Sequence, residues 1–306
     1  MTSRTLLLLT ATVLGLAAAR PARACSVCGC GDPMLAITEA AGMGGDLQLG
    51  VQGEALTMTA GSDEAPGVLD RLSQQTVRAI AAYSPGDYWN LSLQIPIVHK
   101  RLVSDDAGVT TVTSDLTGLG DVELGARVFV FDAARLAERR RDTVAVSVGT
   151  SLPTGASDTS EGGVRIDQHG QLGTGAFGPY VGLLYRVRKD PFGAYLTATV
   201  RYRTENSYNY RFGWAVLWAA EGQYEPTDWA GVALAIEGRR AAADTAAGET
   251  VGSTGGTVVA VSPSAHVRLL DVLWLGARVQ VPAVVSLYGQ QKVGPTYLLD
   301  IQVKAL

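Results

Sequence analysis

The sequence predicts an all-β protein, a transmembrane antiparallel up-and-down β-barrel of about 12 strands that occupies residues 46–306. Three features of the chain support this prediction. Strand-length segments alternate between apolar and polar residues, the links between them alternate between short and long, and the chain begins with an export signal. Because the strand count is even, both ends of the barrel are expected on the periplasmic side.

The stretch Thr117–Phe131 shows the alternation most clearly. From Val122 onward, successive residues fall on two faces, which is the period of a β-strand. The apolar face holds Val122, Leu124, Ala126, Val128 and Val130, and the other face holds Asp121, Glu123, Gly125 and Arg127. In a membrane barrel the apolar face would contact lipid, whereas in a soluble sandwich it would pack against a second sheet.

Twelve segments of the chain follow this pattern closely enough to be predicted as strands. They are Asp46–Leu56, Gln75–Ser84, Tyr88–Lys100, Gly118–Phe131, Thr143–Ser151, Gly178–Arg188, Phe192–Arg203, Phe212–Tyr224, Asp228–Arg240, Gly256–Leu269, Leu273–Val281 and Thr296–Ala305. Aromatic residues near strand ends on the outward face predict an interfacial girdle. These residues are Tyr83, Phe212, Trp214, Tyr224 and Tyr297.

The links between the segments indicate which end of the barrel is which. Tight turns such as Ser84–Asp87 and Glu225–Thr227 carry good turn residues. Longer polar links alternate with them, namely Gly61–Ser73, Arg101–Thr117, Pro153–His169, Thr204–Arg211, Ala241–Gly255 and Val284–Pro295. Short periplasmic turns and longer extracellular loops are typical of outer-membrane barrels. One link on the short-turn side, Asp132–Asp142, is long and basic, with room for a helical turn in the periplasm.

Residues 1–24 have the layout of a secretory signal peptide. Arg4 precedes an apolar run from Leu6 to Ala19, and Ala22–Ala24 forms an A-x-A cleavage site ahead of Cys25. The run is shorter than the roughly 20 residues that a membrane-spanning helix needs. Export together with a barrel of amphipathic strands predicts the outer membrane of a Gram-negative bacterium.

Charged residues recur on the strand faces opposite the apolar ones, which predicts a lumen of mixed charge. The predicted lumen-lining residues are Arg78, Asp121, Glu123, Arg127, Arg186, Arg201, Arg203, Glu237, Arg239, Arg268, Arg278 and Asp300. In a soluble sandwich they would form the solvent face, so the loop lengths, the aromatic residues and the signal peptide decide for the barrel. The net charge of −4 gives no reason to expect nucleic acid as a partner. The predicted partners are outer-membrane lipid and a small-molecule solute.

Two short Gly-rich motifs carry a resemblance to a known family. With the run Gly118–Arg127, the motif Leu152–Gly155 and the strand rhythm to the C-terminus, the chain resembles the outer-membrane channel family associated with meta-pathway degradation of phenol. Gly173–Gly175 ahead of a strand adds to the resemblance, which covers the chain from about Asp46 onward. Long-chain fatty-acid transporters of outer membranes have a similar sequence pattern. The resemblance implies a barrel that moves small, hydrophobic or aromatic molecules inward.

Residues 25–45 form a separate N-terminal segment that contains all three cysteines. Cys25, Cys28 and Cys30 form a C-x-x-C-x-C run, and thiolates at this spacing can bind one soft ion such as Cu(I) or Zn(II). Three methionines just downstream favour Cu(I), namely Met34, Met43 and Met58. A local disulfide and lipidation of Cys25 are the alternatives. Met34–Gly45 is rich in small apolar residues and predicts either a plug in the barrel mouth or a disordered leader.

The chain carries no catalytic motif of the G-x-S-x-G or H-E-x-x-H type, and its three histidines are scattered, so we expect no enzyme. Two functional hypotheses follow. In the first, the barrel is a channel for small solutes, with residues 25–45 as its plug. In the second, a largely closed barrel is a scaffold or a metal- or redox-responsive anchor, and the cysteine segment meets a periplasmic partner protein.

Overall fold

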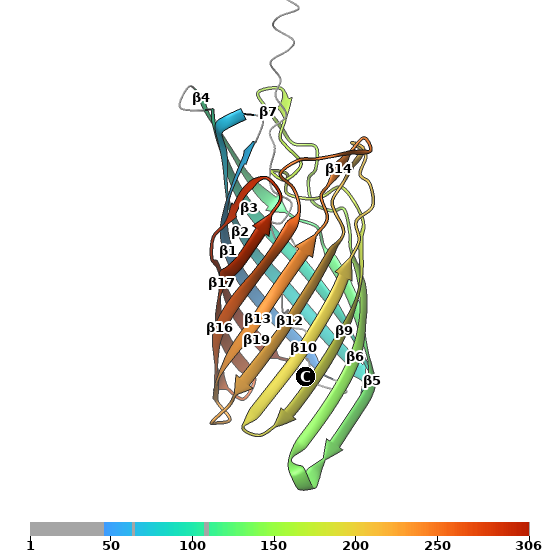
Figure 1. Cartoon of the computed structure of the whole chain (residues 1–306). Coiled ribbons are helices and arrows are strands. Elements are labelled where there is room, and N and C mark those ends of the chain that lie inside the picture. Colours follow the sequence, from blue (N-terminus) through green and yellow to red (C-terminus); the bar gives the residue numbers. More distant parts are fainter. Residues whose placement is uncertain (1–45, 63–64, 107–109, 306) are drawn as a thin grey trace, which may run out of the picture.

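The computed structural model describes residues 46–62, 65–106 and 110–305, which form a closed antiparallel β-barrel of tilted strands (Figure 1). The strands of the wall are β1 (Leu47–Ser62), β2 (Ala65–Gly86), β3 (Trp89–Asp106), β4 (Thr110–Leu119), β5 (Glu123–Arg135), β6 (Arg140–Ser151), β9 (Gly178–Lys189), β10 (Phe192–Arg201), β12 (Ala215–Tyr224), β13 (Ala230–Ala241), β16 (Gly256–Leu270), β17 (Leu273–Leu287), β18 (Gln290–Val293) and β19 (Thr296–Lys304). The signal peptide and the cysteine segment lie outside the described residues.

Pairing between the first and last strands closes the barrel. β1 pairs with β2 on one side and with β19 on the other. β4 and β5 both pair with β3, one beyond the other, and β18 and β19 follow each other along β1 in the same way. The wall is therefore twelve strands around, which confirms the predicted fold class and, with it, an outer-membrane β-barrel.

Both ends of the barrel chain meet at the end with short turns. Lys304 Nζ lies 2.8 Å from Asp46 Oδ1, and the Ala305 N–H donates to the Leu47 carbonyl at 2.7 Å. The turns at this end include Asp190–Pro191 and Asp271–Val272. The opposite end carries the long loops, with the short strands β7 (Ser160–Glu161), β8 (Val164–Arg165), β11 (Tyr210–Arg211), β14 (Thr245–Ala246) and β15 (Glu249–Thr250). The predicted orientation, with short periplasmic turns and longer extracellular loops, is confirmed.

The hairpin of β5 and β6 reaches further into the periplasm than the other turns (Figure 1). Its tip is a single 3₁₀ turn, Leu136–Glu138, in the link where the sequence left room for a helical turn. Within the described part of the chain, no helix combines the length and apolar character needed to span a bilayer.

The outward face is apolar along the whole wall, as the alternation predicts. Leu124, Val128 and Val130 are exposed, and Leu299 on β19 is 65% exposed. Tyr83, Trp214, Tyr224 and Tyr297 are exposed near strand ends, where aromatic girdles lie. Phe212 is an exception, because its ring packs 5.1 Å from the ring of His169 inside the barrel. Its predicted outward position is wrong, since β12 begins only at Ala215 and the alternation does not extend back to Phe212.

Two extracellular links predicted as loops are largely strand. β2 begins at Ala65, inside the predicted loop Gly61–Ser73, and β3 and β4 occupy most of the predicted loop Arg101–Thr117. Inward-facing apolar residues stabilise these extensions, since Leu72 and Leu102 belong to one buried cluster with Leu56, Met58 and Ala60. The hairpins of β1 to β4 therefore continue as paired strands beyond the positions where the sequence pattern fades.

The predicted strand Gly118–Phe131 is interrupted at Gly120–Val122, where β4 ends and β5 has not begun. The facing residue on β3 is Pro96, which has no N–H to donate to the ladder. The Gly120 N–H still donates to the Pro96 carbonyl at 2.9 Å. A Cβ at Gly120 would lie 2.9 Å from Val98 Cγ2, so only glycine fits this close approach.

Candidate functional site

The barrel interior has three levels from the extracellular to the periplasmic end. At the extracellular level a long connection, Leu152–Phe177, called the inner loop here, packs against residues of the lumen wall. Below it lies a layer of buried ion pairs, one between the neighbouring strands β1 and β2 and others between strands that are not adjacent in the wall. At the periplasmic level a cavity of about 560 Å³ opens between the strands, called the periplasmic cavity here.

Lys100 on β3 attaches the inner loop to the wall. Its ammonium donates to the carbonyl of His169 at 2.9 Å and to that of Gln171 at 2.5 Å, and the whole residue is buried. The Gln171 side chain in turn donates to the carbonyls of Thr159 and Ile166 at 2.9 and 2.8 Å. A buried lysine without such acceptors would be costly, so these bonds hold both the lysine and the loop in place.

Asp121, in the break between β4 and β5, provides a second attachment. Its carboxylate accepts hydrogen bonds from the Gly155 N–H at 3.1 Å, the Thr174 N–H at 2.8 Å and the Thr174 hydroxyl at 2.5 Å. The loop crosses itself tightly here, because a Cβ at Gly173 would lie 2.5 Å from the Gly155 carbonyl oxygen. The Gly-rich motifs of the sequence thus meet Asp121 at one point of the fold.

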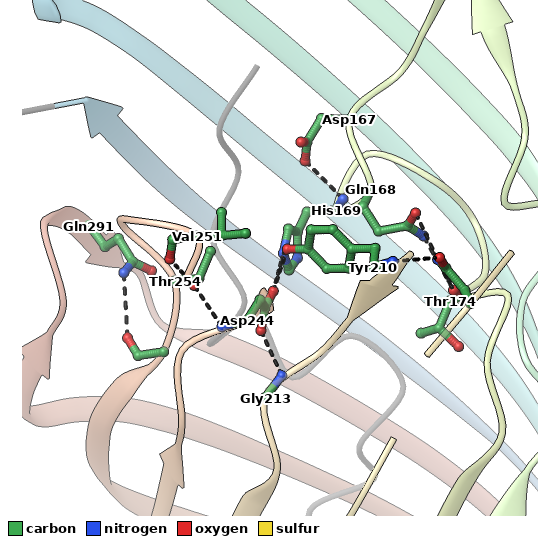
Figure 2. Close-up of polar contacts among 12 residues, drawn as sticks. Asp167, Gln168, His169, Thr174, Tyr210, Gly213, Asp244, Val251, Thr254 and Gln291 are labelled. Atoms are coloured by element: carbon green, nitrogen blue, oxygen red, sulfur yellow. Dashed lines mark hydrogen bonds and ion pairs between the residues drawn. The ribbon is translucent and has the colours of Figure 1, made fainter. Parts of the chain in front are cut away.

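A third attachment joins the inner loop to the extracellular loop after β13 (Figure 2). His169 Nε2 lies 2.8 Å from Asp244 Oδ2, which also accepts a hydrogen bond of 2.5 Å from the Tyr210 hydroxyl. The Gly213 N–H donates to the other Asp244 oxygen at 2.7 Å. Burial raises the pKa of Asp244, but the hydrogen bonds from His169, Tyr210 and Gly213 outweigh it and hold this pKa below its ordinary value.

Asp167 lies beside this cluster and has the opposite character. Its Oδ1 accepts the His169 N–H at 2.9 Å (Figure 2). Burial raises the pKa of the Asp167 carboxyl above its ordinary value, with a smaller contribution from the nearby Asp244 charge. The pKa values of the two carboxyl groups of one cluster are therefore shifted in opposite directions.

These attachments leave little open space at the extracellular level. Among the described residues, a pocket at this level has a volume of about 60 Å³, and Lys100, Asp121, Arg203, Arg239 and Asp244 are among the residues that line it. Asn206 strengthens the closure, since its amide donates to Gln168 Oε1 and to the Thr174 carbonyl, both at 3.0 Å. The inner loop is thus a fixed constriction at the extracellular mouth.

The middle level consists of ion pairs that are almost fully buried. Arg78 Nη1 donates to Glu54 Oε2 at 3.0 Å and Arg201 Nη1 lies 2.8 Å from Glu123 Oε2. Arg78 is only 1% exposed. Pairing offsets the cost of placing these charges inside the barrel.

A second buried network lies closer to the periplasmic cavity. Arg278 on β17 pairs with Glu237 and, at 2.6 Å, with Glu221. The Tyr195 hydroxyl donates to Glu221 at 2.9 Å, and Gln280 donates to Glu237 at 2.6 Å. This network forms the roof of the periplasmic cavity, which Tyr195, Glu221 and Arg278 also line.

The periplasmic cavity owes its volume to small side chains on one wall. Inward positions on β13, β16 and β17 carry Ala233, Ser264 and Gly276. The opposite wall is filled instead by an apolar cluster that includes Phe129, Ala145, Leu184 and Tyr195. The cavity therefore lies beside this cluster, and residues of β9, β10 and β12 line it together with residues of β16, β17, β19 and β1.

The twelve residues predicted to line the lumen occupy all three levels. Asp121, Arg203 and Arg239 line the extracellular pocket, Arg78, Glu123, Arg201 and Glu237 form buried pairs, and Arg186, Arg268, Arg278 and Asp300 line the periplasmic cavity. Arg127 is half-buried, and its Nε donates to Ser147 Oγ at 3.3 Å.

The sequence interpretation missed the residues that attach the inner loop, among them Lys100, Gln171, Tyr210 and Asp244. The signal available was the length of the connection after β6, because loops of more than about 15 residues are usually functional. Of the scattered histidines, His169 is buried in this cluster, whereas His99 contacts the exposed Asp115 at 3.4 Å. Among the described residues, no group of three or more His, Cys, Asp or Glu side chains is arranged to bind a metal.

No protein-family model and no curated protein matches the chain. Solved structures do match it. The COG4313 outer membrane channel from Pseudomonas putida F1 is 14% identical with a TM-score of 0.65, over 86% of this chain and 97% of that one. A Pseudomonas aeruginosa FadL homologue is 12% identical with a TM-score of 0.43, over 84% and 90%. The first of these likenesses supports the outer-membrane barrel fold.

Proposed function

We propose that the protein is an outer-membrane channel for small solutes. The observation that supports this proposal is the asymmetry of the interior, with a periplasmic cavity of about 560 Å³ below a constriction built from a single loop. A barrel that only anchors another protein needs no such cavity, whereas a solute that passes the constriction does. The charged residues predicted to line the lumen would then set which solutes pass.

We infer from the sequence resemblance that the solutes are small aromatic molecules. The Pseudomonas putida protein that shares the barrel fold is named an outer membrane channel, in agreement with this class of function. Mixed charge beside aromatic side chains such as Trp274 and Tyr195 suits aromatic molecules that carry polar groups. Residues 25–45 are proposed as a plug that enters from the periplasm, because β1 starts at the rim of the periplasmic cavity next to Asp46.

Solute uptake into liposomes tests the channel. The purified full chain and a form without residues 25–45 are compared for uptake of benzoate, phenol and arabinose. We expect uptake with the full chain and faster uptake without the segment. A lack of uptake of all three solutes by the shortened protein would exclude the channel.

A matched pair of substitutions on β16 locates the path. Ser264 lines the periplasmic cavity, and Val261 on the same strand is exposed on the outward face. Ser264→Trp should slow uptake at least severalfold, since the side chain enters the cavity, and Val261→Trp should leave it unchanged. Equal uptake by the two variants would place the path elsewhere.

The second candidate is a scaffold or a metal- or redox-responsive anchor for a periplasmic partner. The anchored inner loop, which leaves a pocket of about 60 Å³ beside Lys100 and Asp244, is the observation that favours it. The proposed ion at Cys25, Cys28 and Cys30 is Cu(I) or Zn(II). Metal analysis of protein purified anaerobically under reducing conditions, compared with the triple Cys→Ser variant, tests this site. Equal metal content in the two proteins would exclude it.

A further inference from the structure

Six inward positions on three neighbouring strands form a small array in the wall of the periplasmic cavity. In one row across the strands, His266 on β16 faces Gly276 on β17, which faces Asp300 on β19. In the next row, Arg268 faces Trp274, which faces Gln302. All six residues line the cavity.

The middle of the array is an aromatic surface beside a glycine that the Asp300 carboxylate covers. The Trp274 ring lies 5.6 Å from the His266 ring, and the Arg268 guanidinium lies 5.4 Å from the Trp274 ring centre. Next to Trp274, Gly276 leaves the wall without a side chain. A Cβ at Gly276 would collide with Asp300 Oδ1, so the glycine allows the carboxylate to lie over its neighbouring strand.

The two charged members, Arg268 and Asp300, stand at opposite corners of the array. Several other charged groups of the cavity are paired with one another, since Arg188 pairs with Glu225, Arg278 with Glu221, and Lys304 with Asp46, and Arg186 and Asp271 also line the cavity outside the array. Among the described residues, no carboxylate lies within ion-pair distance of Arg268, and Asp300 accepts a hydrogen bond of 3.0 Å from the neutral Gln302 amide. The array therefore presents one cation and one anion on either side of an aromatic surface.

Strand spacing gives the scale of the array. Neighbouring strands lie about 4.8 Å apart, so the backbones of Arg268 and Asp300 are separated by roughly 10 Å across the sheet. The long arginine side chain shortens the gap between the two charged groups. A single benzene ring with polar groups on opposite carbons matches such a gap, whereas an α-amino acid, with both charges next to one carbon, does not.

We propose that this array is a binding site for an aromatic acid that carries a hydrogen-bond donor at the far side of its ring. The ring stacks on Trp274, the carboxylate pairs with Arg268, and the donor, a hydroxyl or amino group, bonds to the Asp300 carboxylate above Gly276. This inference rests on the proposed function in one respect only, that the solute reaches the periplasmic cavity. A cavity of about 560 Å³ is of the size that small-molecule sites have.

Calorimetric titration of the full chain in detergent tests the ligand chemistry with three probes. 4-Hydroxybenzoate has both polar ends, benzoate lacks the donor, and phenol lacks the carboxylate. We expect 4-hydroxybenzoate to bind about tenfold more tightly than either of the other two, because each end adds a hydrogen bond to a charged group. Equal affinity for all three probes would overturn the proposal.

Substitutions at the two corners should each affect a different set of probes. Arg268→Gln should weaken binding of 4-hydroxybenzoate and benzoate by about tenfold and leave phenol unchanged. Asp300→Asn should weaken binding of 4-hydroxybenzoate and phenol and leave benzoate unchanged. Lys304→Gln, in the same cavity but outside the array, is the control and should change none of the three. If either corner variant weakens all three probes equally, the assignment of the two ends is wrong.

Trp274→Phe provides a separate readout for the ring. Probe binding should quench the tryptophan fluorescence of the wild type, and this quenching should be lost in Trp274→Phe while a flat ring remains for stacking. Quenching that persists in the variant would place the ligand elsewhere. Binding without uptake into liposomes would retain the site and exclude the channel, and uptake without binding would retain the channel and exclude the site.

Discussion

The extracellular and periplasmic halves of the lumen are built by the same twelve strands, yet one is closed and the other is hollow. The extracellular half keeps a pocket of about 60 Å³, and the periplasmic half a cavity of about 560 Å³. In the first half, the inner loop and the apolar cluster of β1 to β3 occupy the space. In the second half, small inward residues such as Ser264 and Gly276 leave the space open.

The comparison shows that strand number alone does not determine how open a barrel is. A barrel of this size lies between small filled barrels and open porins. Anchoring of the inner loop determines how open the extracellular half is, because Lys100, Asp121 and Asp244 each hold one part of this loop. The size of the inward side chains determines how open the periplasmic half is. Substitutions can change the loop anchoring and the inward side chains separately, so each half of the lumen can be tested by itself.

The largest expected effect concerns the roof of the periplasmic cavity. Arg278→Leu would leave Glu221 and Glu237 buried without their cation, which should lower the free energy of unfolding by about 3–5 kcal/mol. Arg135→Leu removes an exposed pair with Glu138 and should cost less than about 1 kcal/mol. Urea unfolding of the two variants in detergent micelles measures both. A similar loss in the two would mean that the network does not hold this half of the barrel together.

The second effect concerns the two faces of the barrel wall. The apolar face should contact lipid, and the other face should line the lumen. Ala126 on β5 lies between the exposed residues Leu124 and Val128, so Ala126→Arg should cost about 2–4 kcal/mol near the bilayer centre. Ser264→Arg faces the periplasmic cavity instead and should cost much less. Gly125 is no suitable inward control, because a Cβ there would lie 2.5 Å from the Tyr180 hydroxyl. Equal destabilisation of the two variants in lipid vesicles would contradict the inside–outside assignment.

The sequence predicts the barrel well because the relevant signals are local. Alternation within a strand depends on neighbouring residues only, so twelve segments and the orientation of the turns follow from it. The same reasoning fails at Phe212, where the chain is held by the Gly213 N–H bond to Asp244 and leaves the strand period. It also fails at Gly120–Val122, because the cause lies on another strand, at Pro96.

The inner loop shows why the candidate site was only partly predictable. Lys100 contacts carbonyls 69 and 71 residues away, and His169 contacts Asp244 across 75 residues. No spacing in the sequence links these residues, and each taken alone resembles an ordinary surface group. Parity placed the charged residues on the inward face, but it contains no information on which charges pair or where space remains. The pairing of Arg268, Trp274 and Asp300 in one array depends on strand register, which sequence alternation leaves open.

The third effect concerns the closed half. Asp244→Asn removes the charge that accepts hydrogen bonds from Tyr210 and Gly213 and lies beside His169, which should weaken the anchoring of the inner loop by about 1–3 kcal/mol. The extracellular constriction should then open more often, so single-channel recordings should show more frequent open events. Glu249→Gln, an exposed position in the same extracellular loop, is the control. Equal opening frequencies in the two variants would show that Asp244 does not keep this half closed.

The smallest effect is a pH dependence of the same constriction. Asp167 has a raised pKa, so this carboxyl binds a proton more tightly when the inner loop is anchored than when the loop is released. The anchoring therefore weakens as pH rises through that raised pKa. Asp244 has a lowered pKa, so its contribution is present above the ordinary carboxyl pKa and is lost as pH falls through the lowered one.

The two carboxyl groups together predict the tightest closure near the ordinary carboxyl pKa of about 4, with more opening as pH rises above it or falls below it. Asp167→Asn keeps an oxygen for the His169 N–H and removes the ionisation. The open fraction at neutral pH should therefore fall about twofold, and the rise between acidic and neutral pH should disappear. Single-channel recordings from pH 4 to pH 8 measure both. An unchanged rise in Asp167→Asn would assign the pH dependence to another group and leave the inner loop as a closure that does not respond to protons at this position.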